Sequence, residues 1–475
     1  MRLLAACLLL AGLSLFLPSV PSFDPWAWIV WGREVASFEL NTVGGPSWKP
    51  LPVFFTAIFA PLGAIDESVP PALWIVVARA GALLALAMAF LLARRLAGPS
   101  RWAGLAAGTL AALALAFTPQ WLRNAAHGNE VPLAVGLLLW GVHLHLEGRR
   151  LAAIVLGFLA CLLRPEVFPF LAAYAVWLWR AEPERRVVVA GLAVALPVVW
   201  LVPEWIGSGD PLSAGNQARS EPPWSLSLTA RPWLAALERA HNLAGLPIEL
   251  GALAAAACAW RRREGVDRVT LALAGVALAW LGLVVIMVEA GFSGSPRYFI
   301  PAVVLGCVLA GVGAARLVEA MPGTGAATAV ALVLAAVLAP WAGDRVRYLE
   351  RQANGVTALR DQHEQLVTLV NRLGGVDAVL QPGNPRISPA FMTHLAWEAD
   401  LHFEDLEASP GKGFVFIHAA RSRGRPAPSA AQLRGASRVI GAWHLRQPLA
   451  TASGERRSIR ARDETRVRPS APTRR

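Results

Sequence analysis

Acids, a base and several tryptophans share the first polar segment of this chain. The ionisable candidates are Asp24, Glu34 and Lys49, and the aromatic ones are Trp26, Trp28, Trp31 and Trp48. The segment follows a leucine-rich stretch, so the sequence places it at a membrane surface, where a carboxylate without a partner or a function is costly. Asp24 is therefore a candidate for taking a proton from an acceptor hydroxyl, or for helping to hold a metal.

Structural roles are the alternatives for the same residues. Asp24 is followed by Pro25, a pair typical of a helix start in which the acid accepts hydrogen bonds from the first backbone amides. The tryptophans are typical of an aromatic belt at the membrane–water interface, and rings at this density also suit stacking on sugars. We interpret most of the tryptophans as a belt and keep both roles open for Asp24.

Two basic residues far apart in the chain are candidates for binding a phosphate group. Lys49 opens a short apolar segment, 53–62, and Arg297 with Tyr298 begins a long apolar run. A guanidinium offers a planar fork for two phosphate oxygens. The alternatives are a lysine that extends to the interface and an Arg-Tyr pair that anchors a helix there.

Two more polar groups interrupt apolar sequence. His127 and Glu130 are three residues apart, so they could share a metal or a proton, although a helix cap explains the segment equally well. Arg164 and Glu166 flank Pro165 inside an apolar block. Because a bare Arg at membrane depth costs about 3 kcal/mol, Glu166 is its predicted partner. The sequence leaves the cofactor unknown and a divalent metal open.

The composition is that of a multi-pass membrane protein. Hydrophobic residues make up 55% of the chain and charged residues only 16%, whereas about a quarter of a soluble protein is charged. The net charge of +12 comes from short connections between apolar runs and from a basic tail. No nucleic-acid-binding module surrounds these charges, so we predict no nucleic-acid partner.

Apolar runs predict about eleven membrane-spanning helices, each needing about 20 residues. The runs lie near 2–20, 71–93, 102–119, 131–146, 187–206, 245–260, 269–289, 298–319 and 324–342. The block 150–180 adds two short helices that meet at Pro165.

Arginine clusters predict a side for alternate loops. They follow the even-numbered spans near 94–101, 149–150, 180–186 and 261–268. Such loops face the cytoplasm, which predicts a cytoplasmic N-terminus and places every candidate site residue on the outer face of the cell membrane. A transporter would more often place its ionisable groups near the membrane midplane.

The chain is predicted to have three parts. Residues 1–342 form the transmembrane domain, whose first outer loop is 21–70, residues 343–452 form a small extracytoplasmic α/β domain, and residues 453–475 form a disordered basic tail. Within the small domain we predict an amphipathic helix over 356–373 and strands over 376–380, 413–418 and 438–443.

On these residues the chain resembles the GT-C superfamily of integral membrane glycosyltransferases, in the branch related to protein mannosyltransferases and aminoarabinose transferases of lipid A. In that family an acid lies in the first outer loop, where this chain has Asp24. A Lys-Pro segment follows before a short amphipathic helix, as at Lys49, and an Arg-Tyr pair opens a late span, as at Arg297. Many members have two adjacent acids where this chain has Asp24 and Pro25, which leaves Glu34 as the nearest candidate for the second acid.

The resemblance implies an all-α polytopic fold and sugar transfer from a polyprenyl-phosphate donor, within the membrane lipid, to an extracytoplasmic glycan, lipid or protein. Asp24 would be the general base, Lys49 and Arg297 would stabilise the departing phosphate, and the anomeric carbon would be inverted. Further candidates for binding substrate or phosphate are Tyr298, Arg164, Glu34, His127 and Glu130. The alternative is a non-enzymatic transporter or envelope-polymer assembly factor, which predicts no pocket joining Asp24 to Arg297.

Overall fold

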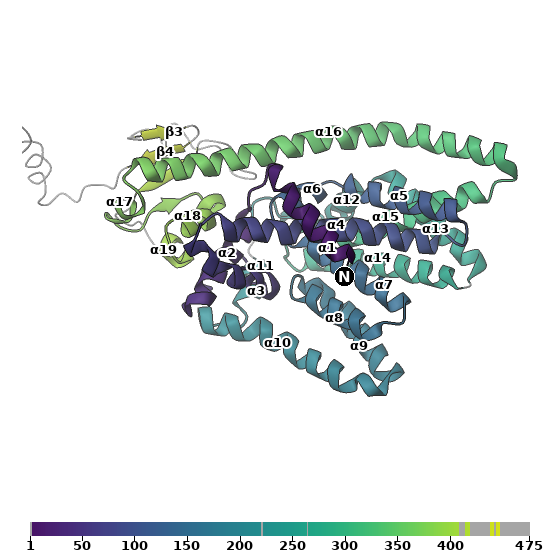
Figure 1. The fold of residues 1–475 in the computed structure, drawn as a ribbon, viewed down its shortest axis with the longest axis horizontal. Helices are drawn as coiled ribbons and strands as arrows, with labels where there is room; N and C mark the ends of the chain where they lie inside the picture. The colour runs from purple at the N-terminus through teal and green to yellow at the C-terminus, as the bar shows by residue number, and fades with distance from the viewer. Residues whose placement is uncertain are drawn as a thin grey trace, which may run out of the picture.

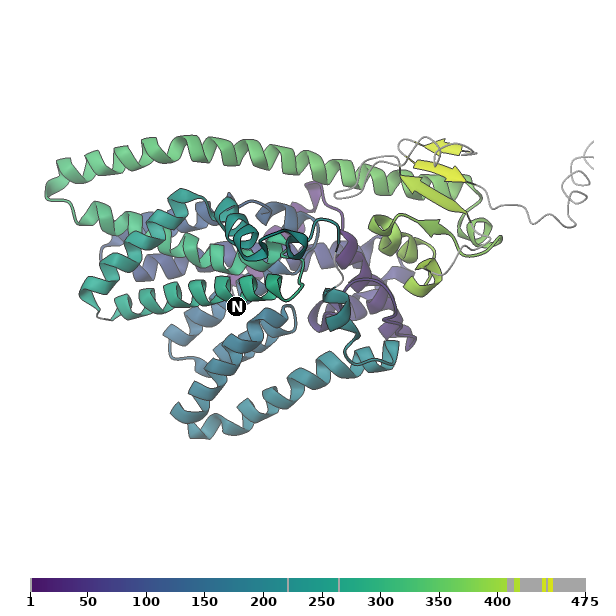
Figure 2. The same cartoon turned by 180° about the vertical axis from the view of Figure 1, so that it is seen from behind.

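The computed structural model describes residues 2–219, 222–263, 265–407, 414–418, 438–440 and 443–446. Figure 1 shows a long bundle of helices with a small helix-and-strand region at one end, and the view from behind shows the same arrangement (Figure 2). We call this end, where α17 to α19 and the strands lie, the domain end, and the other the opposite end. The predicted tail, 453–475, lies outside the described residues.

Five described helices are long and apolar enough to cross a membrane, so the chain is a multi-pass membrane protein. They are α4 (Val69–Leu96), α10 (Arg186–Ser208, with the preceding turn), α14 (Val266–Glu289), α15 (Pro296–Glu319) and α16 (Gly323–Arg372). Two more, α12 (Pro232–Ala244) and α13 (Leu246–Arg262), make a sixth if their 90° bend is counted within one span. The bend falls at Gly245, whose φ of 80° favours glycine.

The predicted number of eleven spans is not confirmed, because several apolar runs form helices shorter than a bilayer crossing. These are α1 (Arg2–Leu13), α5 (Arg101–Ala116), α7 (Val131–Leu146) and α8 (Arg150–Cys161). The helix α3 (Pro50–Phe59) falls on the short apolar segment 53–62, which is not among the eleven predicted spans. The remaining short helices of the bundle are α6 (Trp121–Ala126), α9 (Phe168–Ala181) and α11 (Ser213–Ala218). As predicted, α8 and α9 meet at a turn containing Pro165.

Ion pairs and helix-end contacts join the arginine-containing loops at the opposite end. Arg95 donates a 2.7 Å hydrogen bond to the carbonyl of Leu146, at the end of α7. Arg316 pairs with Asp267 at 2.8 Å and donates to the carbonyl of Leu96, at the end of α4. These contacts gather the connections near residues 96, 146 and 267 at the opposite end, and which end faces the cytoplasm stays a prediction.

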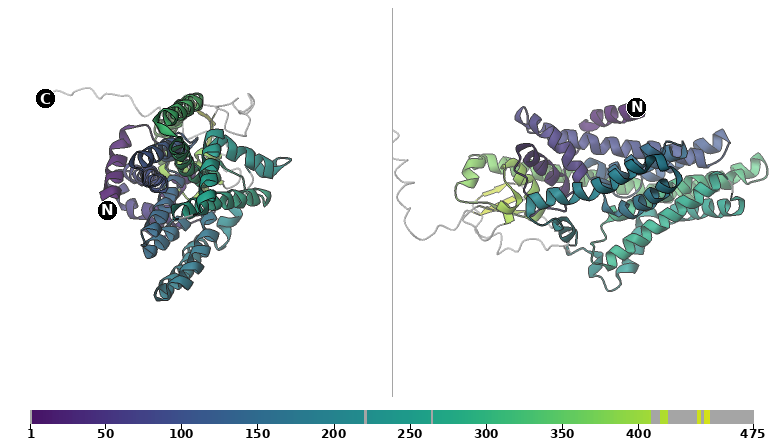
Figure 3. Two further views of the ribbon diagram at one scale, coloured as in Figure 1. Left: turned by 90° about the vertical axis from the view of Figure 1, so that its right-hand side faces the viewer. Right: turned by 90° about the horizontal axis from the view of Figure 1, so that it is seen from below.

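The helix α16 connects the bundle to the domain end. It has 50 residues and so runs about 75 Å, along one side of the bundle in Figures 1 and 2; Figure 3 (left) shows it end-on at the edge of the bundle. It ends before Gly374 and Gly375, whose φ angles of 105° and 88° stop the helix. The predicted strand over 376–380 is wrong: these residues restart a helix, α17 (Val376–Leu380), with Asp377 in its first turn.

A four-stranded sheet completes the domain end, in the order β1-β2-β4-β3. Its strands are β1 (Arg386–Ile387), β2 (Val415–His418), β3 (Arg438–Ile440) and β4 (Trp443–Arg446). The helices α18 (Met392–Glu398) and α19 (Phe403–Glu407) lie between β1 and β2 in the chain. Strands therefore occur within two of the three predicted segments.

The segment predicted as the first outer loop packs against the domain end through the helix α2 (Phe23–Ser37). Its tryptophans are buried: Trp26 is 6% exposed, Trp28 and Trp31 are 0%, and Trp48 is 3%. The ring of Trp31 packs on Phe403 of α19, with centroids 5.6 Å apart. The prediction of an interfacial belt is wrong for these four, because they are buried in one cluster with residues of α4 and of α16 to α19.

Candidate active site

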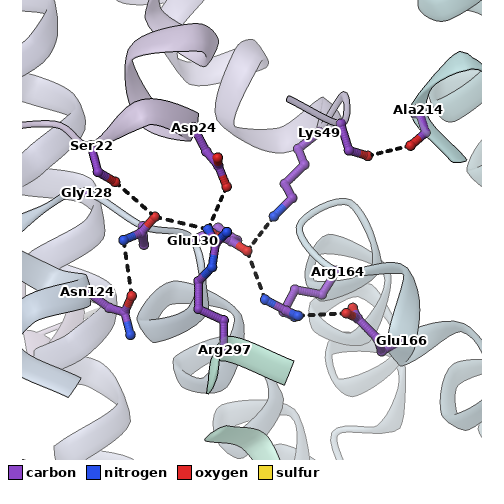
Figure 4. Close-up of polar contacts among 12 residues, drawn as sticks. Ser22, Asp24, Lys49, Asn124, Gly128, Glu130, Arg164, Glu166, Ala214 and Arg297 are labelled. Atoms are coloured by element: carbon purple, nitrogen blue, oxygen red, sulfur yellow. Dashed lines mark hydrogen bonds and ion pairs between the residues drawn. The ribbon is translucent and has the colours of Figure 1, made fainter. Parts of the chain in front are cut away.

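A pocket of about 570 Å³ lies at the domain end and brings together six of the eight predicted site residues. They are Asp24, Lys49, Glu130, Arg164, Arg297 and Tyr298. With Glu166, the pocket lining has three acids and three bases. We call Asp24, Lys49, Glu130, Arg164, Glu166 and Arg297 the charged cluster (Figure 4).

Glu130 is the carboxylate on which the three bases of the cluster converge (Figure 4). It is fully buried, at the residue before α7. Lys49 and Arg164 donate to its Oε1, the latter at 2.9 Å, and Nη1 of Arg297 lies 3.5 Å from Oε2. Burial alone would raise the pKa of Glu130, but the charges of these three bases outweigh burial and lower the pKa to about 2.

Asp24 is held by Arg297 and does not cap its helix. Since α2 begins at Phe23, its N-cap is Ser22, so the predicted capping role of Asp24 is wrong. The carboxylate instead accepts a 2.6 Å hydrogen bond from Nη1 of Arg297, which also donates to Asn129 at 3.2 Å. Asp24 lies in the first turn of α2, where a negative charge is favoured by the helix dipole.

The residue before a proline is extended at two places in the cluster. Lys49 precedes Pro50 with φ −141° and ψ 115°, and Arg164 precedes Pro165 with φ −144° and ψ 114°. Clash with the proline ring disfavours the helical conformation at the residue before it. Lys49 and Arg164 are therefore extended, and each lies immediately before a helical segment. The sequence thus dictates the local backbone from which both side chains reach Glu130.

Arg164 and Glu166 form the predicted ion pair. Their atoms Nη2 and Oε1 are 2.6 Å apart, and Arg164 is only 2% exposed. The guanidinium also lies 5.1 Å from the ring centroid of Tyr298, a cation–π contact. Burial lowers the pKa of Arg164, but Glu166 and Glu130 more than offset burial and raise it. Arg164 is therefore a permanent positive charge in the pocket.

Lys49 is the base of the charged cluster whose pKa is lowered by its surroundings. Burial lowers its pKa, and the neighbouring guanidinium groups lower it further, while Glu130 and Asp24 act in the opposite direction. Its ammonium also lies 5.4 Å from the ring centroid of Trp28. A phosphate oxygen in the pocket would favour the charged form of this lysine.

Two predicted residues do not line the pocket. Glu34 accepts a 3.0 Å bond from the amide of Asn41 and contacts His402 of the C-terminal domain at 2.8 Å. Nδ1 of His127 contacts the carbonyl of Val20 at 3.0 Å, and a role of His127 in binding stays a prediction. Among the residues that the structure describes, no group of three or more His, Cys, Asp or Glu side chains is placed to hold a metal ion.

The sequence missed the part of the pocket that comes from distant segments. These residues include Trp200 of α10, Pro222 to Trp224 after α11, and Ser388 to Ala390 of the C-terminal domain. None of them carries a pattern that indicates chemistry, since apolar and small residues of this kind occur throughout the chain. Residues 388–390 reach the pocket because α16 returns the chain to α2, and the sequence does not show the path of this helix.

Burial of His127 predicts a stability that depends on pH. The residue is 2% exposed, and burial with the charge of Arg123 lowers its pKa to about 4, despite the bond to Val20. Because the unfolded chain takes up this proton near pH 6.5, stability is complete above that pH and falls as the pH drops towards 4. We expect a loss of roughly 3 kcal/mol over this range, seen as a falling Tm in detergent micelles.

The variant His127→Gln is the control for this expectation. It has no group that titrates between pH 6.5 and 4 at this position, so its Tm should fall less steeply over the same range. Equal slopes for both proteins would assign the pH dependence to other residues.

Two solved structures are similar to this chain. They are the crystal structures of ArnT from Cupriavidus metallidurans bound to undecaprenyl phosphate and in the apo state. Sequence identity is 16% for each; the matches cover 85% and 84% of this chain and 84% of each ArnT chain, with TM-scores of 0.49. No protein-family model matches the chain, and no curated protein sequence matches it either.

Proposed function

We propose that the chain is a membrane glycosyltransferase that moves a sugar from a polyprenyl-phosphate donor to an acceptor at the outer face of the membrane. One observation carries the proposal: Asp24 and Lys49 of the first polar segment line one pocket with the distant Arg297, and Glu130 contacts both bases. The non-enzymatic alternative predicts no pocket that joins Asp24 to Arg297. In this reading the domain end faces outward and the N-terminus is cytoplasmic.

The three bases of the charged cluster suit the departing phosphate. Like charges at this spacing repel strongly in a buried site, and Glu130 holds them together before any ligand arrives. The hydrogen bonds and ion pairs of Arg297 with the described residues use Nη1, which leaves Nη2 for a phosphate oxygen. Fixed positive charges stabilise the phosphate anion most where it develops, in the transition state.

Asp24 suits the role of general base. In the proposed step, the carboxylate takes the proton of an acceptor hydroxyl while the hydroxyl oxygen attacks the anomeric carbon. The bond from that carbon to the phosphate oxygen breaks, and its electron pair leaves with the polyprenyl phosphate. One displacement of this kind inverts the anomeric carbon, as the family resemblance implies.

The phosphate role is tested by binding of undecaprenyl phosphate to the purified protein in lipid nanodiscs. We expect Lys49→Ala and Arg297→Ala each to weaken binding about 10- to 100-fold, because each removes a charged hydrogen-bond donor worth about 1.5–3 kcal/mol. Arg101→Ala is the matched control, since Arg101 begins α5, is exposed and does not line the pocket.

The control separates a specific site from general attraction of the basic protein to anionic lipid. If Arg101→Ala weakened binding as much as Arg297→Ala, the pocket would not be the phosphate site. Binding that stays unchanged in both pocket variants would have the same meaning.

A further inference from the structure

The C-terminal domain supplies part of the pocket wall. Ser388, Pro389 and Ala390 line the same pocket as Asp24 and Arg297, although they follow α16 and lie far along the chain. They precede and begin the short turn 389–391, which leads into α18. The pocket that we assign to sugar transfer is therefore incomplete without this domain.

Arg33 holds the C-terminal domain to the helix that carries Asp24. Its guanidinium donates to the carbonyls of Trp397 and Leu401, both at 3.3 Å, and pairs with Asp400 at 2.9 Å. The last carbonyls of a helix have no partner within the helix, and a positive charge there also suits the helix dipole. Arg33 thus binds the C-terminal end of α18.

The neighbouring acid adds a second polar contact across the same interface. Glu34, 2% exposed, contacts Nδ1 of His402 at 2.8 Å. The sequence had suggested this acid for substrate binding, and its position assigns it to the domain contact. Burial raises its pKa, while the bonds from Asn41 and His402 act in the opposite direction.

Apolar packing makes the interface continuous with the active-site helix. Trp26 and Trp31 of α2 share a buried cluster with Leu395 of α18 and Phe403 of α19. Arg33 lies nine residues after Asp24 on the same helix, a rise of about 14 Å. A change at Arg33 can therefore alter the pocket wall without touching the charged cluster.

The position of the domain indicates which substrate meets this wall. The apolar part of α16 ends near Pro340, and its polar part, 344–372, continues for about 43 Å to the C-terminal domain. The tail of a lipid carrier must stay in the bilayer, whereas 388–390 belong to the part of the chain that is carried beyond it. An acceptor that comes from the aqueous phase would enter on this side.

We propose that residues 388–390 form the acceptor side of the pocket and that Arg33 is the positioning residue that holds them there. The proposal rests on the proposed function. Two kinds of measurement test it, one on docking of the domain and one on transfer.

Docking is measured by hydrogen exchange of the backbone amides in α18, using the full-length protein in nanodiscs. Arg33→Ala should raise exchange about 10-fold or more, because it frees the end of this helix, and Arg33→Lys should raise it less, since a charge remains. Arg360→Ala is the matched control: Arg360 has an exposed ion pair with Glu364 and should leave α18 unchanged. If Arg33→Ala left exchange unchanged, the positioning role would be overturned.

Transfer is measured as release of undecaprenyl phosphate from a panel of undecaprenyl-phosphate-linked hexoses and pentoses, with envelope extract as the acceptor source. Ala390→Trp, which fills the wall, should abolish extract-dependent release while binding of undecaprenyl phosphate stays within two-fold. Arg33→Ala should raise the amount of extract needed for half-maximal rate. Unchanged release in both variants, or a loss of lipid binding as large as that of Arg297→Ala, would overturn the acceptor side.

Failure of the proposed function gives a different pattern. A wild-type protein that releases no undecaprenyl phosphate from any donor would overturn the function and, with it, the acceptor side. The exchange of α18 would still decide whether Arg33 holds the domain.

Discussion

Asp24→Asn is expected to lower sugar transfer about 10²- to 10⁴-fold, the usual contribution of a general base. Asn has nearly the same shape and can still accept a hydrogen bond from Arg297, which now donates to the carboxylate at 2.6 Å. It cannot take a proton from an acceptor hydroxyl. The fall should therefore appear in the rate at saturating donor, measured as release of undecaprenyl phosphate, with donor binding retained.

Asp66→Asn is the matched control in the same outer loop. Asp66 is exposed and accepts a 2.8 Å bond from the amide of Ser68, so its substitution should leave transfer near the wild-type rate. If Asp24→Asn transferred sugar as fast as Asp66→Asn, Asp24 would be only the partner of Arg297. A variant that failed to bind donor would instead show that the ion pair shapes the pocket.

Glu130→Gln is expected to destabilise the protein by about 3–5 kcal/mol, because it leaves buried positive charges without their partner. Lys49, Arg164 and Arg297 all contact this carboxylate, so both Tm and lipid binding should fall. The lowered pKa of Glu130, about 2, means that its contribution is complete above about pH 4.5 and is lost as the pH falls towards 2. The measurement is thermal unfolding in micelles at pH 7.

The control for Glu130 is Glu364→Gln, at the exposed ion pair with Arg360. Exposed pairs contribute about 0–1 kcal/mol, so its Tm should stay close to that of the wild type. If Glu130→Gln were as stable as this control, the cluster would not depend on its central carboxylate.

The sequence predicted the charged cluster because the residues that form it are rare in their surroundings. An acid, a lysine and two arginines in apolar segments are costly, and their loops fall on one side of the alternating topology. The predicted topology therefore placed Asp24, Lys49 and Arg297 on the same side of the membrane. Three-residue spacing did not predict the partner of Glu130, which came from other helices and not from His127.

The burial of the tryptophans and the position of residues 388–390 at the pocket could not be predicted, and the reason is the same for both. Both depend on α16 bringing the C-terminal domain back to α2, a contact between segments more than 300 residues apart. Aromatic rings at an interface and aromatic rings in a core have the same local sequence. The strand predicted over 376–380 also failed, because a five-residue segment with four apolar residues fits either element, and here it follows two glycines and forms a helix.

The central claim is that this pocket transfers a sugar from a polyprenyl phosphate. It is tested most directly by mass spectrometry of undecaprenyl phosphate released from the donor panel by the reconstituted protein with envelope extract, comparing the wild type with Lys49→Ala/Arg297→Ala. We predict release by the wild type from at least one donor and about a hundredfold less or none by the double variant. Equal release by both proteins, or none by the wild type from any donor, would contradict the claim.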